Sequence, residues 1–214
     1  MPHWLWYVGA AVVVGIYFYI TWKEKQKTHS DYAQLASGLG WRYEKYSTDY
    51  NSRYRKYSPF DDGKRPRADY VFHGSRRGRP LVVFQYSADF EYTEGRSKRQ
   101  HWQVTVVGMA NDVSTLEVGP RGTLGRIAQR AGLGQNTGDD YFDRRYAVKT
   151  ADKDLAATLL NDDVRSLLRR RKDDANLLLH GTEIVTWRNG PLYPDDMEPW
   201  VDFLNDVLDR AGLE

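Results

Sequence analysis

The apolar positions of this chain follow three patterns, and each pattern predicts a different kind of element. In the first, every residue from Trp4 to Trp22 is uncharged, and most are apolar. A helix of that length rises to about 28 Å at 1.5 Å per residue, which is close to the thickness of the hydrocarbon core of a bilayer. We therefore expect residues 4–22 to form a transmembrane helix that anchors the chain.

Residues typical of a membrane interface flank this stretch at both ends. The expected interface residues are Trp4, Trp6, Tyr19, Trp22, Lys23, Lys25 and Lys27. Lysines follow the stretch and none precedes it, which favours an N-terminus outside the cell, a single crossing of the plasma membrane, and a cytoplasmic remainder. A cleaved signal peptide and a helix of a soluble core are the alternatives. A signal peptide would carry positive charge before its apolar core and small residues after it, and this sequence has neither.

The second pattern is the alternation of apolar and polar residues, which is typical of half-buried strands. It covers residues 68–74, 79–92 and 98–109, which are rich in Val, Phe, Tyr and Trp and are separated by short polar turns. These stretches predict an antiparallel meander of three strands. Shorter strands are expected at residues 41–44, 115–119 and 144–150, and a hairpin is expected at residues 176–190.

The third pattern is the spacing of apolar residues by 3.6 positions, which predicts helices. It is clearest near the C-terminus, at Met197, Trp200, Val201, Leu204, Val207 and Leu208. Further helices are expected at residues 31–38, 121–132, 152–161 and 162–172. Paired acids such as Asp139 with Asp140 stand where turns and helix starts are expected, and they predict helix caps. The polar, tyrosine-rich residues 45–67 predict mainly an exposed loop.

Together these elements predict the α+β class: one N-terminal transmembrane helix, followed by a soluble domain with an antiparallel β-meander and flanking helices. The predicted domains are residues 1–27, an anchor with a basic flank, and residues 28–214, a cytoplasmic α+β domain. Turn-forming residues leave a possible sub-boundary near residues 132–140.

Composition and charge narrow the possible functions. The chain has no cysteine, so disulfides, thiolate catalysis and cysteine-ligated metals are excluded. The formal net charge of +2 hides an asymmetry, because basic residues are in excess over residues 23–138 and acidic residues over residues 139–214. A tethered domain with this distribution is expected to turn its basic side toward anionic lipid.

Several sequence segments carry a resemblance to a known family. They are "LASGLGWRYE", "RRGRP", "LEVGPRGTLGRI", "YFDRRYAVKTAD" and "LLLHGTEIVTWRNG". Together with the apolar N-terminal stretch, they resemble a family of uncharacterised single-span membrane proteins of high-GC Gram-positive bacteria. The resemblance covers most of the chain and implies a location and a fold, and it supplies no active-site residue.

No motif in the sequence supports catalysis or a metal site. His73 and His101 lie on expected strands that could bring them together, but a metal needs at least three good ligands. Gly119, Gly122 and Gly125 lie at the start of an expected helix without satisfying either phosphate-loop pattern. We therefore predict no catalytic residue, no cofactor and no metal. An enzyme whose site is assembled only in the fold is left open as an alternative.

Tyrosines and basic residues are interleaved over residues 41–57, as in proteins that grip single-stranded nucleic acid. Glu44 and Asp49 dilute the positive charge, and the same residue types suit contacts with lipid or protein. Nucleic-acid binding is therefore the least favoured alternative.

The favoured interpretation is a membrane-anchored cytoplasmic interaction or scaffold protein with its basic face toward anionic lipid. Its partners would be membrane lipid and another protein. The candidate residues for lipid or partner contact are Lys64, Arg65, Arg67, Arg76, Arg77 and Arg79.

Overall fold

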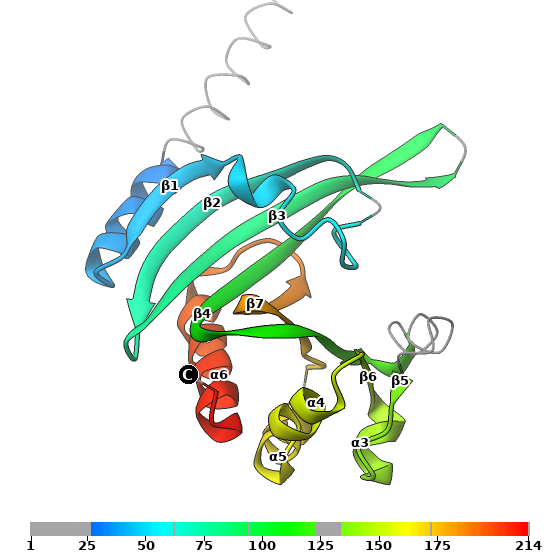
Figure 1. Cartoon of the computed structure of the whole chain (residues 1–214). Helices are drawn as coiled ribbons and strands as arrows, with labels where there is room; N and C mark the ends of the chain where they lie inside the picture. The colour runs from blue at the N-terminus through cyan, green and yellow to red at the C-terminus, as the bar shows by residue number, and fades with distance from the viewer. Residues whose placement is uncertain (1–26, 62, 94, 123–133, 172, 214) are drawn as a thin grey trace, which may run out of the picture.

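The chain folds around one antiparallel sheet with helices packed against it, as a computed structural model shows (Figure 1). The structure describes residues 27–61, 63–93, 95–122, 134–171 and 173–213. The strands run in the order β1-β2-β3-β4-β6-β5, and β7 pairs with β4. Their bounds are β1 Arg42–Ser47, β2 Lys64–Arg76, β3 Arg79–Thr93, β4 Arg96–Pro120, β5 Gly134–Gln135, β6 Tyr146–Thr150 and β7 Asn176–Asn189.

Two long bent strands, β4 and β7, connect the two ends of this sheet. The first half of β4 lies between β3 and β7, and its second half lies between β6 and β7. The pairing of β4 with β7 shifts register between Gly108 and Val113, and Gly181 of β7 has a φ of +61° at that bend. The expected hairpin at residues 176–190 and the expected separate strand at residues 115–119 are therefore wrong, because each belongs to a continuous bent strand.

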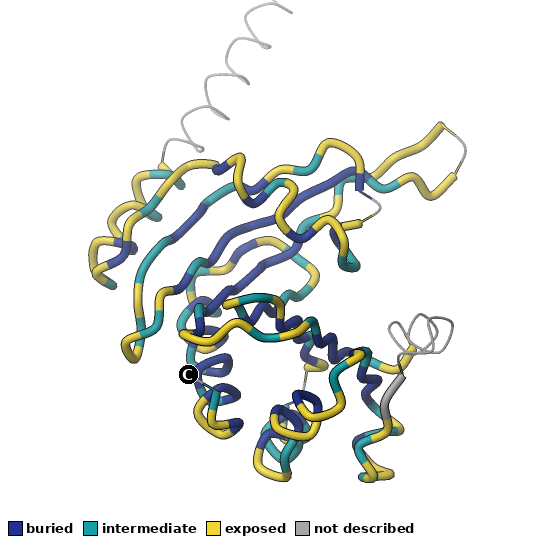
Figure 2. The backbone as a smooth tube through the Cα atoms, viewed as in Figure 1, coloured by how far each residue is buried: buried dark blue, intermediate teal, exposed yellow. Residues whose placement is uncertain are grey.

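Helices cover one face of the sheet, as the ribbon and the burial-coloured tube show (Figures 1 and 2). They are a helix at residues 27–38, α4 Lys153–Leu159, α5 Asp162–Arg170 and α6 Pro194–Ala211. The apolar stripe of α6 is buried against this face, and Val201, Leu204 and Leu208 have no exposed surface. Each fully buried side chain of this kind contributes roughly 1.5–3 kcal/mol to folding. The prediction of a C-terminal helix from its 3.6-residue spacing is confirmed.

The segment of residues 48–60 covers part of the other face of the sheet. It contains the short 3-10 helix η1, Asp49–Asn51, and it buries Tyr50, Tyr54 and Phe60 against strands β2, β3 and β4. The Tyr54 hydroxyl donates a hydrogen bond to Glu183 Oε2 at 3.0 Å, and burial raises the pKa of Tyr54. The expectation of an exposed loop here is wrong, because these aromatic side chains are spaced to fill one face of the sheet.

The predicted fold class, which joined a transmembrane helix to an α+β domain, is contradicted. Among the described residues, no helix is both long enough and apolar enough to cross a membrane. The structure shows an antiparallel sheet with packed helices instead. The stretch from Trp4 to Trp22, which carried the prediction, lies outside the described residues.

The remaining predicted helices differ in outcome. Those expected at residues 152–161 and 162–172 correspond to α4 and α5. The side chains of their N-caps, Asp152 and Asn161, accept hydrogen bonds from backbone N–H groups of the first turn. A helix not expected from the sequence, α3 Asp140–Arg145, begins at its N-cap Asp139 as the predicted cap requires. The helix expected at residues 121–132 lies mostly outside the described residues. The two-domain division, with its possible sub-boundary near residues 132–140, stays a prediction.

Candidate functional site

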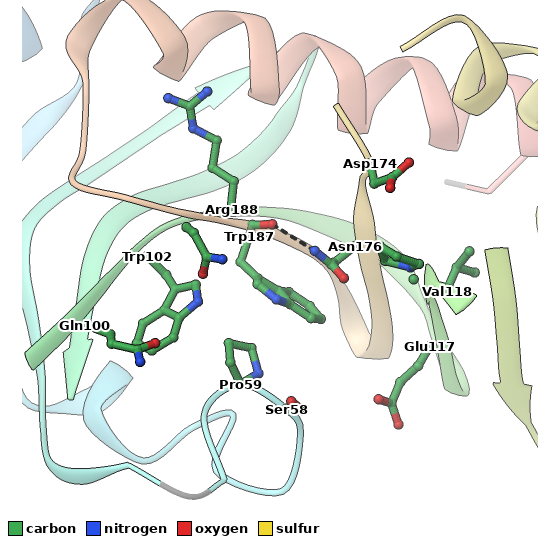
Figure 3. A pocket seen from close by; sticks show the side chains of 13 residues that line it. Ser58, Pro59, Gln100, Trp102, Glu117, Val118, Asp174, Asn176, Trp187 and Arg188 are labelled. Carbon is green, nitrogen blue, oxygen red and sulfur yellow. Dashed lines mark hydrogen bonds between the residues drawn. The ribbon is translucent and has the colours of Figure 1, made fainter. Parts of the chain in front are cut away.

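A cavity of about 440 Å³ lies on the face of the sheet that residues 48–60 cover (Figure 3). Its walls come from the end of that segment at Pro59 and from strands β4 and β7. Small-molecule sites in proteins are clefts of a few hundred to a thousand Å³ that combine apolar walls with a few placed polar groups. This cavity falls in that size range and is lined by both apolar and polar residues, and we call it the tryptophan cavity after its two largest side chains.

Trp102 of β4 and Trp187 of β7 form the aromatic wall of the tryptophan cavity. The two strands are paired so that Trp102 is opposite Asn189 and Trp187 is opposite Val104, which makes the indoles diagonal neighbours. Trp102 is buried and Trp187 is half-buried. Further rings fix both indoles: Phe90 lies 5.2 Å from Trp102 and Phe60 lies 5.5 Å from Trp187, each centroid to centroid and edge to face.

The carboxylate of a buried ion pair lines the tryptophan cavity. Glu117 of β4 lies directly opposite Lys149 of β6 in the sheet, and Lys149 Nζ donates to Glu117 Oε1 at 2.5 Å. The exposed fractions of the two side chains are 6% for Glu117 and 23% for Lys149. A carboxylate this buried needs a partner, because transferring a charge from water into the protein interior costs several kcal/mol when no opposite charge compensates it. The pair therefore places polar groups at the cavity without leaving a net charge there.

Amide side chains supply neutral polar groups at the same cavity. Asn176 Nδ2 donates to the backbone carbonyl of Trp187 at 3.3 Å, the contact drawn as a dashed line in Figure 3. Gln100 and Asn189 are exposed at the rim. Because an amide offers both donors and an acceptor, these groups suit a ligand that also has both.

A second cavity of about 890 Å³ adjoins the first, because Glu117 lines both. Tyr57, Thr115 and Thr150 are among its other lining residues. Thr115 Oγ1 is 3.0 Å from His180 Nδ1 and 3.4 Å from the Tyr57 hydroxyl. The open surface along this face is therefore longer than the tryptophan cavity alone.

The charged groups at the tryptophan cavity are paired within the protein. The cavity's buried carboxylate, on Glu117, is neutralised by Lys149, and no histidine is among the described residues that line it. Across the described part of the chain, no group of three or more His, Asp or Glu side chains is placed to hold a metal ion. His73 contacts Glu44 at 3.3 Å on β1, and β3 separates its strand from that of His101.

The basic residues predicted for lipid or partner contact are all ion-paired. Lys64 pairs with Glu91 at 3.0 Å, Arg65 with Asp89 at 2.6 Å, and Arg67 with Asp69 at 2.7 Å. These three side chains stay 73%, 79% and 61% exposed. Their predicted role stays a prediction.

The arginines of the β2–β3 hairpin contact a row of acids on α6. These acids are Glu198, Asp202, Asp206 and Asp209, and their spacing places them on one helical face. Arg76 donates to both oxygens of Asp202, at 2.6 and 2.7 Å, and Arg79 donates to Asp209 at 2.6 Å. Arg79 lowers the pKa of Asp209 by this hydrogen bond, and Arg77 adds to the effect. Charges that are far apart in the sequence therefore meet in the fold, which reduces the free positive charge of the hairpin.

Most of the predicted membrane-interface residues lie outside the described residues. Of that set, Lys27 is described, and it is exposed. The nucleic-acid alternative loses support, because Tyr50 and Tyr54 face the sheet and cannot stack on bases. The tryptophan cavity itself was missed in the sequence. A signal for it was present in the opposite charges of Glu117 and Lys149, each placed inside an otherwise apolar strand.

Comparisons with known proteins give a likeness of fold. No family model matches the chain, and no curated protein does. Among solved structures, the chain is similar to the crystal structure of the mycobacterial trehalose monomycolate transport factor A, TtfA, with a TM-score of 0.57 and 14% sequence identity. The match covers 84% of this chain and 93% of that chain. At this identity, the similarity extends to the fold alone.

Proposed function

We propose that this chain is a non-catalytic binding module in a membrane-related process, and that it acts by holding a ligand in the tryptophan cavity. The observation that carries the proposal is the cavity itself, which is lined by two indoles, several amides and the carboxylate of Glu117, paired with Lys149. The fold likeness to TtfA supports the membrane-related part, because that protein is named as a transport factor for trehalose monomycolate. We therefore extend the earlier interpretation of an interaction module by giving it a binding site.

We propose that the module works at the plasma membrane with its described domain on the cytoplasmic side. The absence of cysteine and the lysines at positions 23, 25 and 27 support this location. Protease added to intact cells should leave the domain uncut and should cut it after permeabilisation. Digestion in intact cells would place the domain on the outer side.

We also propose that any direct contact with anionic lipid runs through Lys64, Arg65 and Arg67. These side chains are more exposed than Arg76, Arg77 and Arg79, whose exposed fractions are 34%, 41% and 17%. The K64Q/R65Q/R67Q variant should bind anionic vesicles more weakly than the native chain. Equal binding would exclude this surface as the contact.

The main proposal is tested in cells that lack the chain. Restoring the full-length chain is expected to restore the distribution of newly made lipid between the inner membrane and the cell surface, and Trp187→Ala is expected not to. Tyr92→Ala is the matched control, because Tyr92 is an aromatic residue with 65% exposure near the tip of the β3–β4 hairpin and does not line the cavity. An unchanged lipid distribution in cells without the chain would refute the membrane-related function. Full activity of Trp187→Ala would refute the cavity as its site.

A further inference from the structure

We propose that the tryptophan cavity binds a neutral carbohydrate. The ligand would be either a free sugar or the sugar head of a glycolipid, since both present the same rings and hydroxyls. The inference rests on the proposed binding function and adds the chemical class of the ligand. Three observations carry it: the charge balance of the lining, its hydrogen-bonding groups and its aromatic wall.

Every charged residue that lines the cavity already has a partner within the protein. Glu117 pairs with Lys149 at 2.5 Å, and Asp174 pairs with Arg145 at 2.6 Å. The third, Arg188, pairs with Asp196, and its side chain points away from the two tryptophans in Figure 3. A phosphate or a carboxylate would have to displace a carboxylate from its cation, and an amine would have to displace a cation. The cavity therefore favours a ligand without net charge.

The remaining polar side chains match hydroxyl groups. Gln100, Asn176 and Asn189 are amides, and Ser58 is a hydroxyl, so each can donate and accept a hydrogen bond. A sugar hydroxyl also does both, whereas an acyl chain does neither. An acyl chain would make no hydrogen bond to these groups, and any of them that it covered would lose its contact with water, which weakens binding. The amides come from different strands, β4 and β7, so they surround the ligand from more than one side.

The aromatic wall supplies the apolar part of the recognition. Trp187 is half-buried, so part of its indole stays open to the cavity, and Pro59 lies close to it in Figure 3. The C–H face of a sugar ring packs on an indole, because the electron-rich face of the indole attracts the weakly positive hydrogens. The contacts of Phe60 and Phe90 hold both indoles in place before the ligand binds, which lowers the entropic cost of binding. A volume of about 440 Å³ is enough for one or two sugar rings.

The test is a titration of the full-length chain with neutral disaccharides, such as trehalose, maltose and sucrose, followed by tryptophan fluorescence and calorimetry. At least one disaccharide is expected to bind. Trp187→Ala is expected to raise its Kd by at least about tenfold, which corresponds to about 1.4 kcal/mol. Gln100→Ala removes an exposed rim amide without disturbing the core, and a smaller rise in Kd is expected. Tyr92→Ala should leave the Kd unchanged, and circular dichroism checks the fold of each variant.

Titrations with other probes distinguish a lipid-borne sugar from a free sugar, and a carbohydrate from other classes of ligand. A detergent-dispersed glycolipid that binds much more tightly than its free sugar would identify a lipid-borne head group, and equal affinities would identify a free sugar. Equal binding of a lipid with the same tail and no sugar, or binding of a proline-rich peptide alone, would overturn the carbohydrate inference while leaving the proposed binding function intact. Binding of none of these probes, together with full activity of Trp187→Ala in cells, would overturn both.

Discussion

Replacing Lys149 by methionine tests whether the ion pair at the tryptophan cavity is buried in solution. Lys149 Nζ lies 2.5 Å from Glu117 Oε1, and the Glu117 side chain is 6% exposed between Lys149 on β6 and Leu178 on β7. Methionine keeps most of the length of lysine and removes its charge. Removal of one partner of a buried pair costs about 3–5 kcal/mol, because the other charge stays buried without compensation. Since the cavity gives water some access to Glu117, we expect the lower end, about 3 kcal/mol.

Urea denaturation of the native chain, of Lys149→Met, of Glu117→Gln and of the double variant measures this cost as the free energy of unfolding. The double variant should recover much of the loss from Lys149→Met, because no charge remains to be compensated. A loss below about 1 kcal/mol would be that of an exposed pair. That result would refute both the burial of the pair and the charge-balanced cavity built on it.

Three further predictions concern other parts of the fold. Asn161→Ala removes the N-cap of α5 and a 2.7 Å hydrogen bond to the backbone carbonyl of Arg210, and urea denaturation should show a loss of about 1–2 kcal/mol; no loss would mean that the cap is replaced by water. Gly181→Ala adds a side chain at a φ of +61° and should cost about 1–2 kcal/mol by the same assay, whereas an unchanged stability would show that the bend in β7 relaxes. The pKa of Asp209 is lowered by Arg79, so the pair stabilises the fold above the unfolded pKa of the carboxyl and this contribution disappears as the pH falls through the folded pKa. Melting temperatures from about pH 5 down to about pH 2 should therefore fall less steeply for Asp209→Asn than for the native chain, and parallel curves would contradict the linkage.

Local periodicity predicted those elements whose own side chains determine their structure. The alternation over residues 68–74, 79–92 and 98–109 corresponds to strands β2, β3 and β4, which pair in an antiparallel order. The spacing of Met197, Trp200 and Val201 and of the later apolar residues corresponds to α6. In α6 one face is buried and the other meets water, so the period of the pattern follows the geometry of the backbone, whereas the middle of β3 and the first half of β4 are buried on both faces of the sheet.

Periodicity failed where the environment of a segment is set by a distant one. Residues 45–67 are polar in composition, yet Tyr54 and Phe60 are buried because the sheet offers them an open face. The pattern of residues 176–190 predicts a hairpin, but β4 continues alongside this segment and pairs with both of its halves. The contradicted fold class rested on length and hydropathy in residues 4–22, which lie outside the described residues.

The sequence by itself determined three strands of the sheet and the C-terminal helix, because each depends on residues close together in the chain, and its lack of cysteine excludes cysteine chemistry. The tertiary structure alone decided that Glu117 meets Lys149, that Trp102 lies beside Trp187 and that the hairpin arginines face the acids of α6. These contacts join residues that are distant in sequence. They depend on strand register and helix docking, and a shift of one residue in register would move each side chain to the opposite face of the sheet.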